Sequence, residues 1–120
     1  MKRIATISLV ISFLSATTIN IPADYATIQE GINAAVDGDI VIVSQGTYYE
    51  NLMINKEITL MSTANFEDDI EGNEDWHDNQ IINQTIVNGS NLANPNKRSC
   101  LVVRDGDVQP TIKGFTFEGG

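Results

Sequence analysis

The sequence contains few of the residues that cross-link a small exported protein or activate a nucleophile. It contains one cysteine, Cys100, one histidine, His77, and three prolines among 120 residues. A single cysteine cannot form an internal disulfide, so the disulfide-rich class of small scaffolds is excluded. Only His77 is available to activate Cys100, and the surrounding Ser-Cys-Leu-Val-Val segment favours a small buried apolar residue over a reactive thiol.

Basic residues are also scarce. Seven lysines and arginines stand against 16 aspartates and glutamates, which gives a formal net charge of −9. Two of those basic residues, Lys2 and Arg3, lie at the extreme N-terminus. Nucleic acids and anionic membranes attract proteins through basic surfaces, so neither is expected as a partner. The same balance opposes tight binding of polyanions such as pectate unless a cation bridges the two.

No apolar run is long enough to cross a membrane. The longest, Ile4 to Ala16, follows Lys2 and Arg3 and spans about 13 residues, the pattern of a secretory signal peptide. A membrane-spanning helix takes about 20 residues. We therefore expect residues 1–17 to be a signal peptide, residues 18–120 to form one domain, and the product to be secreted or displayed at the cell surface.

One amphipathic helix is predicted near the start of this domain. Ile28, Ile32, Ala35 and Val36 recur at the spacing of one helical face. Thr27 and Glu30 have the spacing of a capping box. Gly38 is placed to end the helix in a left-handed conformation. The predicted helix therefore runs from 27 to 36.

Short β-branched runs follow, separated by turn residues. We predict strands at 18–21, 40–44, 52–54, 58–61, 85–87, 100–103 and 111–117, the last bent at Gly114. Parallel strands need long connections, yet only one helix is found. Stacking the strands as successive turns of a parallel β-helix resolves this conflict. The inward-facing pairs would be Ile40 and Ile42, Leu52 and Ile54, Ile58 and Leu60, Leu101 and Val103, and Phe115 and Phe117.

A longer pattern resembles a known superfamily. The pieces Thr27-Ile-Gln, Ala34-Ala, Gly38-Asp, Gly46-Thr-Tyr and Glu50-Asn, with the strand after Lys56, resemble the entry segment of pectin-lyase-like right-handed parallel β-helix proteins. The segment Ile112-Lys-Gly-Phe-Thr-Phe resembles a later rung. The resemblance implies an all-β solenoid with an N-terminal capping helix, truncated at its C-terminus. Residues 18–120 would be the cap and first rungs, and residues 64–84 an acidic loop.

The resemblance leaves two classes of function open. Pectin methylesterases and polysaccharide lyases share the entry segment, but no catalytic motif of theirs occurs in residues 39–120. No catalytic residue and no cofactor is therefore assigned, and an enzymatic site would lie beyond residue 120. The interpretation we favour is a non-enzymatic scaffold that presents a surface to polysaccharide or to a cell-surface protein.

The acidic loop carries the remaining candidates. Seven of the 16 acidic residues fall between 65 and 78, and four of them match ligand positions of an EF-hand-like frame around Gly72: Glu67, Asp69, Glu71 and Asp78. Calcium binding is one interpretation, and a solvated acidic loop without metal is the other. Trp76 and His77 either contact a sugar or anchor the loop. Asn83-Gln-Thr and Asn88-Gly-Ser are N-glycosylation sequons in a host that modifies them, and Asn88 also suits a turn.

Overall fold

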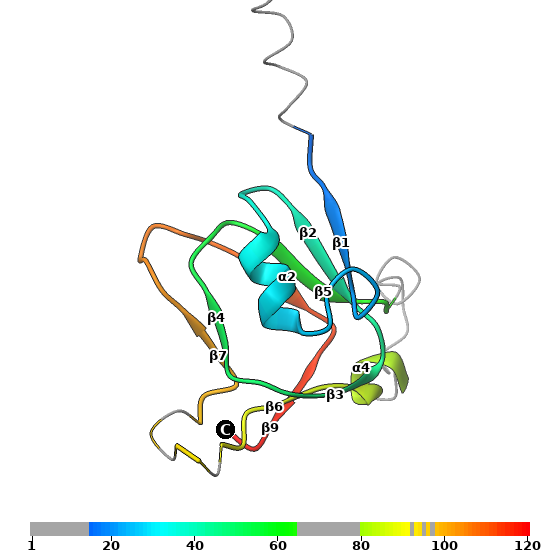
Figure 1. The fold of residues 1–120 in the computed structure, drawn as a ribbon, viewed down its shortest axis with the longest axis vertical. Helices are drawn as coiled ribbons and strands as arrows, with labels where there is room; N and C mark the ends of the chain where they lie inside the picture. Colours follow the sequence, from blue (N-terminus) through cyan, green and yellow to red (C-terminus); the bar gives the residue numbers. More distant parts are fainter. Residues whose placement is uncertain (1–14, 65–79, 92, 95, 97) are drawn as a thin grey trace, which may run out of the picture.

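The structure is a computed structural model that describes residues 15–64, 80–91, 93–94, 96 and 98–120. These residues form two helices and nine short strands (Figure 1). The helices are α2 (Ile28–Ala34) and α4 (Gln80–Gln84). The strands are β1 (Thr18–Ile21), β2 (Ile40–Val43), β3 (Gly46–Tyr49), β4 (Leu52–Ile54), β5 (Thr59–Ser62), β6 (Thr85–Asn88), β7 (Leu101–Val103), β8 (Thr111–Lys113) and β9 (Thr116–Glu118).

The strands divide into three small sheets. Their orders are β1-β2-β5-β8, β3-β6-β9 and β4-β7. Every pair in these sheets is parallel, as the sequence pattern predicted. Consecutive strands from β2 onward enter the three sheets in rotation, so strands distant in sequence become neighbours. This rotation joins Leu52 to Leu101 across β4 and β7.

The predicted fold class, an all-β right-handed β-helical solenoid, is wrong for the described residues. They form three separate small parallel sheets, of four, three and two strands, and no closed or continuous sheet is found among them. They also contain a second helix, α4, that the sequence analysis missed. The physical reason is that strands of three or four residues end at turns, where the hydrogen-bonded ladder stops and a separate sheet begins.

The core lies between the sheets and helix α2. Val41 and Val43 of β2 are fully buried, whereas the predicted inward pair Ile40 and Ile42 is only half-buried. Four consecutive apolar residues contain no alternation, so the pattern could not identify the buried face. The parallel register decides it, because Val41 lies between Ile19 of β1 and Leu60 of β5.

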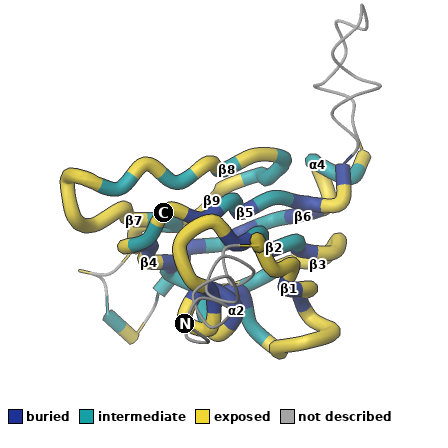
Figure 2. Tube along the Cα trace, turned by 90° about the horizontal axis from the view of Figure 1, so that it is seen from above, coloured by how far each residue is buried: buried dark blue, intermediate teal, exposed yellow. Residues whose placement is uncertain are grey.

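The other predicted inward pairs had mixed outcomes. Leu52 with Ile54 and Ile58 with Leu60 are buried, as predicted. Leu101 and Phe115 pack against the core, but Val103 and Phe117 are each 42% exposed. The exposed pair lies on strands β7 and β9, each at the edge of its sheet. Figure 2 shows the contrast, with dark blue concentrated in the earlier strands.

Helix α2 begins as predicted and ends earlier. Thr27 is its N-cap, and both hydrogen bonds of the capping box with Glu30 are present. The helix stops at Ala34 with an extended C-cap at Ala35, so Gly38 does not end it. Gly38 has a positive φ of 91° in the turn that follows. There the carboxylate of Asp39 accepts the backbone N–H groups of Val36 and Thr17.

The strand boundaries differ from prediction at two further places. Strand β3 (Gly46–Tyr49) was not predicted, although Gly46-Thr-Tyr was recognised as part of the motif. The long run from Thr111 is two strands, β8 and β9, separated at Gly114, whose φ of 85° interrupts the extended chain. The bend was therefore located correctly, although it divides the segment into two sheets.

Oppositely charged side chains fix helix α2 at its two ends. The carboxylate of Glu50 accepts the N–H groups of Ile28 and Gln29, each at 3.0 Å. The ammonium of Lys56 donates to the carbonyls of Ile32, Asn33 and Ala35 at 2.7–3.0 Å. A carboxylate at the N-terminus and an ammonium at the C-terminus both complement the helix dipole. The helix is thus held against β1, β2 and β4, which it contacts (Figure 1).

Two predicted segments lie outside the described residues. They are residues 1–14 of the predicted signal peptide and residues 65–79 of the predicted acidic loop 64–84, whose last five residues form helix α4 instead. Among the helices that are described, none has the length and apolar character needed to span a bilayer.

Candidate functional site

An open pocket lies on the outer surface of the β4-β7 sheet. Its volume is about 250 Å³. The pocket is bounded by β4 with the residue before it, by β7 with the residue after it, and by the turn that precedes β7. Its lining residues are Asn51, Leu52, Met53, Asn96, Ser99, Val102 and Arg104.

The floor of the pocket is apolar. Met53 and Val102 are register partners on β4 and β7, and they are 44% and 39% exposed. Because side chains alternate along a strand, both point outward while Leu52 and Ile54 point to the core. The sheet below is held by hydrogen bonds from Leu52 N to the carbonyl of Cys100 and from Arg104 N to the carbonyl of Ile54.

Asn51 builds one wall of the pocket. Its amide group donates to the carbonyl of Gly89 at 2.8 Å and to the carbonyl of Ser99 at 3.0 Å. Its carbonyl oxygen accepts the side-chain amide of Asn91 at 3.0 Å. One side chain therefore joins segments 38 to 48 residues apart. These hydrogen bonds hold Ser99 beside β4, so the side chain of Asn51 has a structural role.

The backbone groups at the edge of β4, beside the pocket floor, are hydrogen-bonded by a side chain of helix α2. The side-chain amide of Gln29 donates to the carbonyl of Met53 at 3.1 Å and accepts its N–H at 2.8 Å. A glutamine amide offers the same donor and acceptor as a peptide group, so it takes the place of a neighbouring strand. This contact fixes the backbone of Met53 and hence the position of the floor.

The polar wall of the pocket offers both hydrogen-bond donors and acceptors. Arg104, Asn96 and Ser99 are exposed along its wall. A guanidinium carries five N–H donors and no acceptor, and amide and hydroxyl groups can both donate and accept. An apolar floor surrounded by a few polar groups is the usual composition of a small-molecule site. The arrangement suits a ligand with one apolar face and several hydroxyl or carboxylate oxygens.

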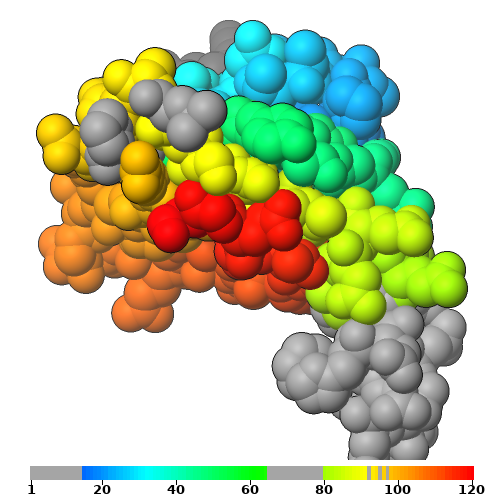
Figure 3. Space-filling view, turned by 90° about the horizontal axis from the view of Figure 1, so that it is seen from below, coloured from blue at the N-terminus to red at the C-terminus, as the bar shows by residue number. Residues whose placement is uncertain are grey.

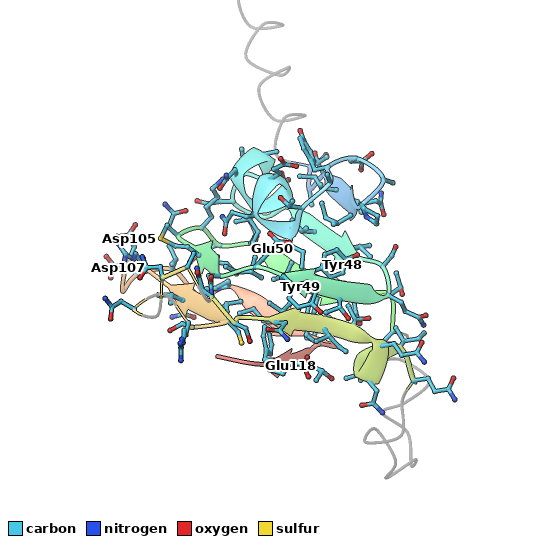
Figure 4. All side chains as sticks on the ribbon, turned by 60° about the horizontal axis from the view of Figure 1, so that its bottom comes forward. Tyr48, Tyr49, Glu50, Asp105, Asp107 and Glu118 are labelled. Atoms are coloured by element: carbon cyan, nitrogen blue, oxygen red, sulfur yellow. The ribbon has the colours of Figure 1, made fainter. Side chains whose placement is uncertain are left out.

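The acidic and phenolic groups labelled in Figure 4 are not among the residues that line this pocket. Figure 4 shows Asp105 and Asp107 projecting at one side of the molecule, apart from Tyr48, Tyr49 and Glu50. Tyr48 donates its hydroxyl to the carbonyl of Ser44, and its pKa is raised by burial and by the charge of Glu50. None of these groups lines the pocket.

The candidates named from sequence have different outcomes. Glu67, Asp69, Glu71 and Asp78, with Trp76 and His77, lie outside the described residues. Within the part of the chain that is described, no group of three or more His, Cys, Asp or Glu side chains could hold a metal ion. Cys100 is half-buried, packs against the core and donates to the carbonyl of Glu118. Tyr48 packs against the core, whereas Tyr49 is 74% exposed.

The pocket itself was missed in the sequence. Its lining comes from residues 51–53 and from residues 96–104, which meet only through the β4-β7 register. Sequence pattern carries no signal for that pairing, because Leu52 could equally have paired with another short aliphatic strand. Asn51 did belong to a recognised motif, but its contacts with Gly89, Asn91 and Ser99 could not be read from the motif.

Comparison with known proteins gives one informative similarity. The chain is 27% identical over 115 residues to a cell surface glycoprotein of Methanothermus fervidus. The alignment covers 85% of this chain and 19% of that protein, so the chain spans about a fifth of the length of this curated relative. No family model matches the chain, and no solved structure matches it. The resemblance to pectin-lyase-like proteins therefore stays a prediction.

Proposed function

We propose that this chain belongs to an exported protein of the cell surface, in which it acts as a non-enzymatic scaffold. The similarity to a cell surface glycoprotein over 85% of the chain carries this proposal. The signal-peptide pattern of residues 1–17 is consistent with export. A strongly acidic chain is also suited to a hydrated surface, because its net charge opposes nonspecific association.

Surface location is tested in the organism that carries the gene. An epitope tag is placed in the exposed turn at Gly106, where an added side chain would meet no atom within 4 Å. Intact cells are then labelled with antibody, with and without protease treatment. We expect surface labelling that protease removes. A matched variant lacking residues 2–16 should stay inside the cell, and equal labelling of both proteins would contradict the proposal.

A second function, carbohydrate binding, is favoured by the pocket on β4 and β7. Met53 and Val102 offer an apolar surface for the C–H face of a sugar ring. Arg104, Asn96 and Ser99 offer donors for its hydroxyl groups. The volume of about 250 Å³ lies just below the range of drug-sized pockets, which fits one sugar residue of a longer chain.

A glycan array followed by NMR titration tests this binding. The 120-residue chain is screened against neutral and uronic-acid glycans, and bound glycans are titrated against the wild type and Arg104→Met. Loss of the guanidinium donors should weaken binding about tenfold, the effect of removing one charge-assisted hydrogen bond. The control is Arg98→Met, which removes the same charge outside the pocket lining. Equal weakening by both substitutions, or no glycan bound by the wild type, would contradict pocket-specific binding.

A further inference from the structure

The two glycosylation sequons occupy different structural settings. Asn83 is exposed on helix α4, and Thr85 at the third position of its sequon begins strand β6. Asn88 is half-buried at the end of β6, and Ser90 follows it in a turn. The motif alone cannot distinguish the two positions. The structure around each asparagine does distinguish them.

A glycan on Asn88 conflicts with the fold. Its side-chain amide donates to the carboxylate of Glu118 at 3.0 Å, and its oxygen accepts the N–H of Ser90 at 2.9 Å. Glu118 is its register partner on β9. The neighbouring Gly119 is so close that an added Cβ would lie 2.6 Å from the Asn88 oxygen. A sugar on this amide would displace Glu118 and the end of β9.

Helix α4 carries Asn83 at an exposed position. Figure 3 shows the residues of α4 in yellow-green at one edge of the molecule and residues 100–110 in orange at the opposite edge. Helix α4 and strand β7 therefore lie at opposite edges of this face.

The sequon at Asn83 is closed once the chain has folded. Thr85 is fully buried, and its hydroxyl donates to the carbonyl of Ile81 at 2.6 Å. A glycosyltransferase that recognises the sequon needs access to this hydroxyl as well as to the asparagine amide. Access requires that the α4-β6 junction be open, so transfer must precede folding of this segment.

From these contacts, and resting on the proposed export, we infer that Asn83 is an N-glycosylation site modified before folding, and that Asn88 carries no glycan in the folded protein. Transfer forms a bond between Asn83 Nδ2 and the anomeric carbon of a sugar. It breaks the bond from that carbon to the phosphate oxygen of a lipid-linked oligosaccharide, releases the lipid phosphate, and passes the amide proton to a base of the transferase. Chains modified at Asn88 lose the Glu118 contact and are depleted from the folded population.

Mass spectrometry of glycopeptides tests the site. The full chain, leader included, is produced in its own organism and in a eukaryotic secretory host, and only exported, protease-resistant protein is collected. We expect a glycan on Asn83 and none on Asn88. Asn83→Gln should abolish the mass increase, Thr85→Ser should retain it, and Asn88→Gln should leave it unchanged. Exported protein without a glycan on Asn83, or with one on Asn88, overturns the inference and leaves surface location standing, whereas absence of export contradicts the proposed function.

The timing has a separate readout. Unmodified full chain from a non-glycosylating host is incubated with transferase and lipid-linked donor, once folded and once denatured and diluted. The denatured chain should be modified about tenfold faster or more, since opening the α4-β6 junction costs the folded chain free energy. Equal rates would overturn modification before folding.

Discussion

The side of the molecule covered by helix α2 and the opposite side both contain edge strands, and they differ in what lies against those edges. On the covered side, edge strands β1 and β4 are closed by polar side chains. Asp24 accepts the N–H of Asn20 on β1, and Gln29 pairs with Met53 on β4. On the opposite side, β7, β8 and β9 are the edge strands, and Val102, Val103 and Phe117 remain 39–42% exposed there. The two sides therefore differ in whether polar side chains satisfy the strand edges, and not in the exposure of outward-facing side chains, since Met53 on β4 is itself 44% exposed.

The largest expected effect separates the buried interior from this edge. Leu60 is fully buried, and its register partner Ile112 on β8 is half-buried. Leu60→Ala should lower the free energy of unfolding by about 2–5 kcal/mol, because a cavity remains between packed neighbours. Ile112→Ala should cost about 1–2 kcal/mol, since solvent already reaches this side chain. Urea unfolding followed by circular dichroism measures both, and equal losses would remove the distinction between the two sides.

The second effect concerns the attachment of the covering helix. Lys56→Met keeps much of the side chain's apolar stem and removes three hydrogen bonds to helix carbonyls. We expect a loss of about 1.5–3 kcal/mol, the range for hydrogen bonds to a charged group. The matched control Arg98→Met removes an exposed charge and should change stability by less than about 0.5 kcal/mol. If the two variants unfold at the same urea concentration, Lys56 does not hold the helix.

The turn after the covering helix makes stability depend on pH. Hydrogen bonds from the N–H groups of Val36 and Thr17 hold the pKa of the buried Asp39 below its ordinary value of 3.8. A lowered folded-state pKa stabilises the protein above the unfolded value, and this contribution is lost as pH falls through the folded value. Asp39→Asn should be less stable by about 1–2 kcal/mol at pH 7.

That difference should narrow as the pH falls below 3.8, because protonated Asp39 and asparagine are both neutral. Unfolding of the two proteins is compared from pH 7 to pH 2. Glu57→Gln serves as a control, since Glu57 is exposed. A stability difference between wild type and Asp39→Asn that stays constant over the whole range would contradict the assigned role.

The smallest effect tests the edge closure of β4. Gln29→Ala removes both hydrogen bonds to Met53 and should cost about 1 kcal/mol. The amide of Met53 should exchange with deuterium several-fold faster, because its acceptor is gone. Gln109→Ala, a change at an exposed glutamine in the connection between β7 and β8, is the matched control. Unchanged exchange at Met53 in Gln29→Ala would show that solvent replaces the glutamine without loss.

Local features were predictable and the assembly was not. The capping box at Thr27 and Glu30 lies within four residues, so sequence spacing specifies it. Strand β4 was predicted at its observed bounds, Leu52–Ile54, because Asn51 and Asn55 flank a short aliphatic run. The buried face of β2 was predicted incorrectly, because Ile40-Val-Ile-Val has no alternation and only the neighbours β1 and β5 choose the face.

Two further failures arise from long-range contacts. The fold class was wrong because short parallel strands are compatible with one continuous solenoid or with separate small sheets. The sequence pattern does not indicate where the hydrogen bonding between neighbouring strands ends. The pocket was missed because residues 51–53 and 96–104 meet only in three dimensions. Glu50 and Lys56 were both part of the recognised motif. Their hydrogen bonds to opposite ends of helix α2 became visible only in the structure.

Gln29, which pairs with the edge of β4, also makes association with other chains less favourable at that edge than at the open edges. A foreign strand that approaches β4 must first displace both hydrogen bonds from Gln29, and one that approaches β1 meets the Asp24 carboxylate at Asn20. A strand that approaches β7 or β9 instead meets exposed Val103 and Phe117. Exposed apolar edges are where strands of other chains add. Fibrils or nonspecific aggregates of this domain would accordingly nucleate and elongate from β7 and β9 more readily than from β1 or β4.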